Sequence, residues 1–94
     1  MNKRIELKFN NSITRLAGNT FGQDIYNKQV KDEVDFEGVN TIVIPSYIED
    51  IAISFVQGFV YGILERISKD EFNKHFIIEA NNKIVNKFKK SVYF

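Results

Sequence analysis

The change of hydrophobic pattern between residues 39 and 67 constrains the fold more than any other feature of the chain. Residues 41–44, Thr-Ile-Val-Ile, form the β-branched run that is typical of a buried strand. After Pro45, apolar residues recur at helical spacing to about residue 67, which predicts a long helix. The apolar positions extend beyond one side of this helix. We therefore expect a sheet together with a second helix, or a partner chain, to cover it.

The same two patterns recur along the rest of the chain. Alternating or β-branched apolar residues predict strands at residues 5–9, 34–36, 41–44 and 75–79. Helical spacing predicts helices at residues 21–31, at residues 46–67 and from about residue 82 onward. The order βαβαβα predicts a single α/β domain over residues 1–94, with a mixed or parallel sheet of about four strands and helices packed against it.

Three sequences of the form Ser/Thr-x-x-Glu/Gln mark expected helix starts, at Thr20, Ser46 and Ser68. In such a capping box, the hydroxyl accepts from one backbone N–H and the Glu or Gln side chain reaches back to another. At Ser46 a second interpretation stays open, namely a phosphorylation or partner-contact site. A helix N-terminus stabilises an anion, but a phosphate here would also be repelled by Glu49 and Asp50.

Composition restricts the classes of function. The chain has 94 residues, enough for one core, and its 13 Lys and Arg nearly balance its 12 Asp and Glu. That balance gives no global attraction to nucleic acid or to anionic membranes. The absence of cysteine excludes disulfides and thiolate chemistry. Because charged residues and Pro45 interrupt the longest apolar region, we expect a core helix rather than a membrane span, in a cytoplasmic protein.

Polar residues gather near the predicted carboxyl ends of the central strands, where open α/β sheets bind ligands. The carboxylates are Asp35, Glu37, Glu49 and Asp50. They could form a solvated rim, a partner surface or a divalent-cation site. Because the sequence places no His or further Asp to complete a shell, we expect no metal and no cofactor. The one histidine, His75, has no partner nearby in sequence, and we expect no catalytic residue.

Two further features suggest binding surfaces. Lysines Lys83, Lys87, Lys89 and Lys90 line the last helix, with Phe88, Tyr93 and Phe94 nearby. Lysines and aromatic rings of this kind can contact phosphates and stack on bases, but they are also typical of the solvated face of a terminal helix. Gly58 and Gly62 have the spacing that allows close helix packing, either within the chain or in a homodimer through the 46–67 helix.

Several segments in sequence order resemble one known family. They are Leu16-Ala17-Gly18-Asn19-Thr20-Phe21-Gly22, Val34-Asp35-Phe36-Glu37-Gly38-Val39, Ser46-Tyr47-Ile48-Glu49-Asp50-Ile51, and Gly58. Together they resemble the STAS-like domains of unknown function grouped as DUF4325, which are relatives of the anti-sigma factor antagonists. The pattern differs in Pro45 and in one additional residue between Val39 and Ser46.

The resemblance implies a STAS-like fold and a non-catalytic, regulatory protein–protein interaction module. It implies an unidentified protein partner, bound at the Ser46 helix N-terminus and the adjoining loop, with affinity adjusted by charge at Ser46 or Thr41. The expected contact residues are Asp35, Asn40, Thr41, Ser46, Glu49 and Asp50. The alternative is a small nucleic-acid- or nucleoprotein-binding accessory or inhibitor protein of a mobile element, which would use the C-terminal lysines.

Overall fold

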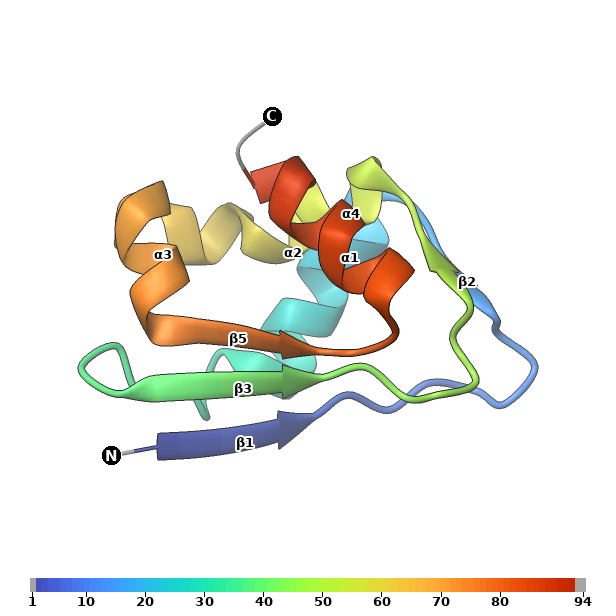
Figure 1. The fold of residues 1–94 in the computed structure, drawn as a ribbon, viewed down its shortest axis with the longest axis horizontal. Helices are drawn as coiled ribbons and strands as arrows, with labels where there is room; N and C mark the ends of the chain where they lie inside the picture. Colours follow the sequence, from blue (N-terminus) through green and yellow to red (C-terminus); the bar gives the residue numbers. More distant parts are fainter. Residues whose placement is uncertain (1, 93–94) are drawn as a thin grey trace.

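Three parallel strands joined by helical crossovers form the main sheet (Figure 1). They are β1 (Asn2–Glu6), β3 (Val39–Val43) and β5 (Phe76–Glu79), in the order β1-β3-β5. The computed structural model describes residues 2–92. A second parallel pair, β2 (Arg15–Leu16) with β4 (Asp50–Ile51), lies beyond the carboxyl ends of the three long strands (Figure 1). The predicted α/β fold is therefore confirmed, and every strand pairing in residues 2–92 is parallel.

The helical elements are α1 (Asn19–Ile25), the π-helix η1 (Tyr26–Val30), α2 (Ile53–Leu64), α3 (Lys69–His75) and α4 (Asn82–Val92). α1 continues directly into η1, so the helix predicted at residues 21–31 is present. The predicted N-cap at Ser68 is present, since its hydroxyl accepts from the Glu71 N–H at 3.1 Å. The box at Thr20 is wrong, because Thr20 lies inside α1 and Gly18 precedes the helix.

The core lies between the main sheet and α1, α2 and α4. Ile42 on β3 is fully buried, as are Phe55 and Ile63 on α2. α1 and α2 approach very closely at two glycines. A side chain at Gly58 would collide with the backbone carbonyl of Asn19, and one at Gly22 with that of Phe55. The glycines thus serve packing within the chain, while a homodimer through this helix, the other alternative, stays a hypothesis.

The two faces of the main sheet have different surroundings. In Figure 1, α1 and η1 pass behind the strands, and no helix of residues 2–92 crosses in front of them. On this open face Thr41 is half-buried and Ile77 is 52% exposed. Arg4 bridges the face, with two hydrogen bonds to the Glu79 carboxylate at 2.7 and 3.0 Å. An open face is unusual, because parallel sheets are generally covered on both sides.

The predicted strand at residues 34–36 is wrong. These residues form a loop and turn, in which the Asn40 side chain accepts from the Asp35 N–H and donates to the Asp35 carbonyl. The first strand also lies earlier than predicted, at Asn2–Glu6 rather than at residues 5–9. Its register with β3 pairs Ile5 with Ile42, which places both side chains in the core.

The predicted helix start at Ser46 is wrong as well. Ser46 and Tyr47 form a turn, and α2 begins at Ile53 after Ala52. The intervening residues are held by the segment that precedes α1. The Tyr47 hydroxyl donates to the Phe9 carbonyl at 2.8 Å, and the Glu49 N–H donates to the Thr14 carbonyl at 2.7 Å. The second bond uses the Glu49 N–H, which would bond the Ser46 hydroxyl if a capped helix began there. No helix in residues 2–92 has the length and hydropathy needed to span a membrane.

Candidate functional site

The expected contact residues lie at opposite ends of the main sheet rather than in one site. Asp35 and Asn40 are at the amino end of β3, whereas Ser46 follows its carboxyl end and Asp50 lies in β4. Thr41 is between them on the open face, in register with Arg4 and Ile77. The prediction that the four carboxylates gather at the carboxyl ends of the strands is therefore wrong. Within residues 2–92, no cluster of three acidic, His or Cys side chains could hold a metal ion.

The amino end is a closed hydrogen-bond network around Asn40, whose side chain is fully buried. Its amide oxygen accepts from the Asp35 N–H at 2.8 Å. Its NH₂ group donates to the carbonyls of Asp35 and His75 at 2.9 and 3.0 Å. The His75 Nδ1 lies 2.7 Å from the Gly38 carbonyl oxygen. These side chains pair with backbone groups of the loop and the strand ends, as buried polar groups generally must. Their role is structural.

The Asp35 carboxylate belongs to the same loop. It accepts from the Glu37 backbone N–H at 2.9 Å, and this bond lowers the pKa of Asp35 below its ordinary value. Such a bond from an Asp to the residue two positions later is typical of a turn. Asp35 therefore stabilises the loop before β3.

The carboxyl end is open by contrast. Ser46 is exposed in its turn and lies on the rim of a hollow of about 440 Å³. We call this the Ser46 hollow; its lining residues are Val43, Ile44, Pro45, Ser46, Glu79, Ala80 and Asn81. Most of this lining is aliphatic. The hollow lies where β3 and β5 end, which is the usual position of ligand sites in open α/β sheets.

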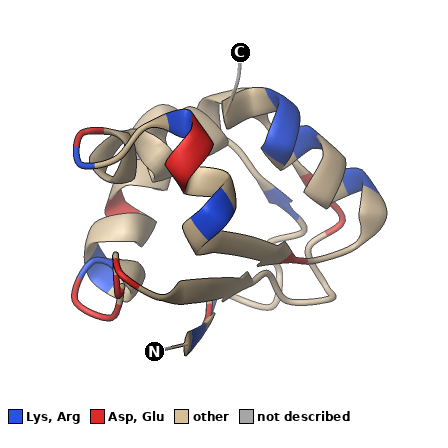
Figure 2. Cartoon of the chain, turned by 60° about the vertical axis from the view of Figure 1, so that its left-hand side comes forward, with Lys and Arg blue, Asp and Glu red and all other residues tan. Residues whose placement is uncertain are grey.

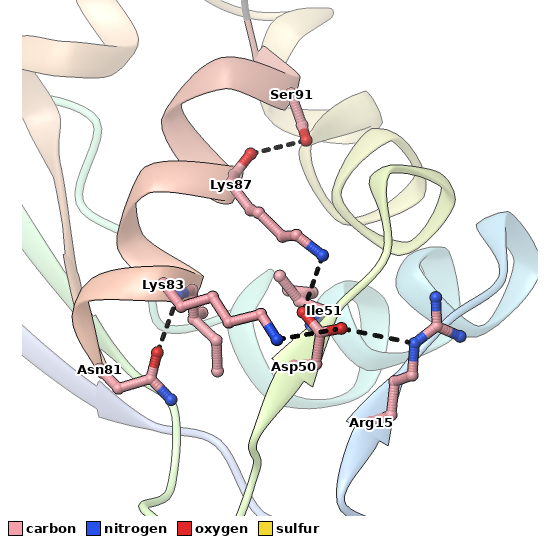
Figure 3. Close-up of polar contacts among 8 residues, drawn as sticks. Arg15, Asp50, Ile51, Asn81, Lys83, Lys87 and Ser91 are labelled. Atoms are coloured by element: carbon pink, nitrogen blue, oxygen red, sulfur yellow. Dashed lines mark hydrogen bonds and ion pairs between the residues drawn. The ribbon is translucent and has the colours of Figure 1, made fainter.

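Next to this end, the Asp50 carboxylate forms ion pairs with three basic side chains from distant parts of the chain (Figure 3). The Lys87 Nζ lies 2.9 Å from its carboxylate, the Lys83 Nζ 3.7 Å and the Arg15 Nε 3.8 Å. The Lys87 hydrogen bond, followed by the Ile51 N–H, lowers the pKa of Asp50 from 3.8 to about 2. Asp50 is therefore ionised throughout the neutral range, and its side chain is 24% exposed.

The predicted lysine surface divides between two sides of α4. Lys83 and Lys87 face Asp50, and Lys87 and Lys90 line a hollow next to Arg15 and Ile53. Lys89 instead lines a separate hollow with Phe72 and Ile77. Figure 2 shows α4 with Lys along its length and no Asp or Glu.

The aromatic part of the nucleic-acid hypothesis is wrong for Phe88. Its ring is 1% exposed and packs against Phe59 and Phe72 in the core, so it has no free face for a base. Tyr93 and Phe94 lie outside the described residues.

Arg15 is the residue of this region that the sequence analysis missed. It lies in a segment with no clear period, and its partner Asp50 is in a strand of two residues.

Comparison of the chain with protein-family models, with curated proteins and with solved structures finds no match. Its function must therefore be inferred from the geometry of its own residues.

Proposed function

We propose that this chain is a non-catalytic regulatory protein–protein interaction module of the STAS-like type, and that it binds its partner through the Ser46 turn and the Ser46 hollow. The observation that carries the proposal is the exposed turn next to an aliphatic hollow at the carboxyl ends of β3 and β5. A partner side chain can bury apolar surface in the hollow while polar groups of the partner contact Ser46. The resemblance to the STAS-like domains implies a contact at Ser46, which lies on the rim of this hollow.

The position of Ser46 also suits regulation by charge. Because Ser46 caps no helix, a phosphate on its hydroxyl would alter the docking surface without removing a helix cap. Thr41 is less suitable, since it is half-buried on β3 next to the Arg4–Glu79 pair. We therefore assign the switch role to Ser46 rather than to Thr41.

A quantitative capture experiment tests the proposal. Wild type, Ser46→Arg and Gln57→Arg are immobilised and exposed to native lysate, and captured proteins are quantified by mass spectrometry. Gln57 is exposed on α2 outside the Ser46 hollow, so its variant controls for the added charge. We expect a protein that wild type and Gln57→Arg retain equally and that Ser46→Arg loses. Equal retention by wild type and both variants, with native circular dichroism, would exclude the Ser46 turn as the docking site.

The nucleic-acid alternative is favoured by one observation, the grouping of Arg15 with lysines of α4. Fluorescence anisotropy with labelled single- and double-stranded DNA, in a series of salt concentrations, tests it directly. Phosphate contacts predict affinity that falls steeply as salt rises. Salt-independent or undetectable binding would remove this alternative.

A further inference from the structure

The surface around Asp50 has more positive charge than its one carboxylate can neutralise. Arg15, Lys83 and Lys87 all form ion pairs with Asp50, and Lys90 lies one helical turn beyond Lys87. The side chains of Arg15 and Lys83 are 58% and 61% exposed. Like charges held this close repel one another. A second carboxylate brought by a partner would therefore find a favourable potential here.

An apolar hollow adjoins these cations. Its volume is about 480 Å³, and we call it the basic hollow; its lining residues are Arg15, Ala52, Ile53, Lys87, Lys90 and Ser91. Ile53 is 44% exposed at the first position of α2. An exposed aliphatic side chain surrounded by cations is suited to a ligand that has both an apolar group and negative charge.

We propose that the basic hollow binds an acidic peptide segment of a partner protein, with one apolar side chain on Ala52 and Ile53 and flanking carboxylates on Arg15, Lys87 and Lys90. This surface is distinct from the Ser46 hollow, and its lining shares no residue with it. The proposal goes beyond the proposed function because it names the chemistry of the ligand. It does not depend on docking at Ser46.

The lining favours a peptide over a nucleic acid. Binding of single strands relies on aromatic side chains on which bases stack, whereas the described residues that line this hollow include no aromatic side chain. Arg15, Lys87 and Lys90 all line this one hollow, and in Figure 3 the side chains of Arg15 and Lys87 both point toward Asp50. An aliphatic or aromatic anchor with neighbouring Asp and Glu residues fits this arrangement.

Asp50 then acts as an internal competitor for the same cations. It holds Lys87 by a hydrogen bond of 2.9 Å and pairs with Arg15 at 3.8 Å, so a partner carboxylate must compete with it. Replacing Asp50 by Asn removes the competing charge and keeps the shape of the side chain. A structural role alone gives no reason for this variant to bind an acidic ligand more tightly.

The test is a nuclear magnetic resonance titration of the whole chain with a synthetic acidic peptide that has one central leucine between Asp and Glu residues. The matched probes are the same peptide with serine in place of leucine and an oligothymidine of similar length. We expect saturable shifts centred on Arg15, Ile53 and Lys87 with the leucine peptide. We expect weaker binding of the serine peptide, by about fivefold or more, because the anchor is lost.

Three variants separate the contributions of a cation, of the apolar surface and of the competing carboxylate to peptide binding. Lys90→Glu and Ile53→Ser are expected to weaken the leucine peptide by about fivefold or more, and Asp50→Asn to tighten it by about threefold. Lys28→Glu, at an exposed position of η1, makes the same charge change as Lys90→Glu away from the hollow and is expected to have a small effect. Each variant is first checked for a native spectrum. If Asp50→Asn does not fold, the other two still decide the proposal.

Several results would overturn the proposal. Equal binding of the leucine and serine peptides would mean nonspecific charge attraction, as would equal losses in Lys28→Glu and Lys90→Glu. Tighter binding of oligothymidine than of the leucine peptide would assign the surface to nucleic acid. Absence of saturable shifts at the hollow would remove the site altogether.

Discussion

The amino and carboxyl ends of the main sheet are similarly polar in sequence but differ in where their polar groups find partners. At the amino end, the Asn40 side chain and the His75 ring pair with backbone groups of the same chain. At the carboxyl end, Ser46 is exposed beside a hollow, and Asp50 is outnumbered by cations. Polar groups that are satisfied within the chain stabilise the fold. Groups that face solvent next to apolar surface are available for a partner.

The largest expected effect is at the amino end. Asn40→Ala removes three hydrogen bonds, so that backbone groups of Asp35 and His75 lose a buried partner. Because each such group costs about 1–3 kcal/mol, we expect the free energy of unfolding to fall by about 3 kcal/mol. Urea denaturation measures the change, and Asn86→Ala on the exposed side of α4 should change it by less than about 0.5 kcal/mol. A small effect of Asn40→Ala would contradict the structural role of this end.

The next largest expected effect is a loss of folding stability at acid pH, caused by protonation of Asp50. The pKa of Asp50 is lower in the folded chain than its ordinary value of 3.8. The ionised carboxylate therefore stabilises the fold fully at pH values above 3.8, and this contribution is lost as the pH falls through about 2. Wild type should therefore exceed Asp50→Asn in free energy of unfolding near neutral pH, and the difference should shrink over that acid range. Denaturation curves at several pH values measure it. A difference that does not depend on pH would show that the ion pairs contribute nothing.

The smallest expected effects concern Ser46 and Ser68, each of which begins a Ser-x-x-Glu sequence. Ser68 caps α3, so Ser68→Ala should lower the free energy of unfolding by about 1 kcal/mol. Ser46 caps no helix, and Ser46→Ala should change it by less than about 0.5 kcal/mol. Thermal or urea denaturation of the pair provides the measurement. A loss at Ser46 as large as that at Ser68 would restore the capping interpretation of Ser46.

Local patterns predicted those elements whose own residues show a clear hydrophobic period or cap signal. The β-branched run near Ile42, the apolar helix around Phe59 and the Ser68 cap follow from nearest neighbours in sequence. The predictions failed at residues 34–36, where the Asn40 side chain bonds the Asp35 backbone, and at residues 46–52, where distant carbonyl groups accept from the backbone. Ser46-x-x-Glu49 has the same pattern as Ser68-x-x-Glu71, but the Glu49 N–H is bound to the Thr14 carbonyl. No local pattern contains that information.

The candidate site was predicted in pieces. Asp50 and Lys87 were each named, but as parts of different surfaces, because 37 residues separate them. Their ion pair depends on the packing of α4 against β4, which only the tertiary structure reveals. Asn40 was named as a contact residue, yet its side chain is fully buried. Asn40 lies two residues before Ile42 and therefore on the same buried face of β3, although its side chain is polar.

Site-specific photo-crosslinking compares the two ends most directly. A benzophenone amino acid is placed at the exposed position Ser46 in one variant and at the exposed position Glu37 in another, and both are irradiated in native lysate. If the carboxyl end is the docking surface, the probe at position 46 forms a covalent adduct with a partner protein, and the probe at position 37 does not. A partner adduct from position 37 alone would contradict the account and assign binding to the amino end.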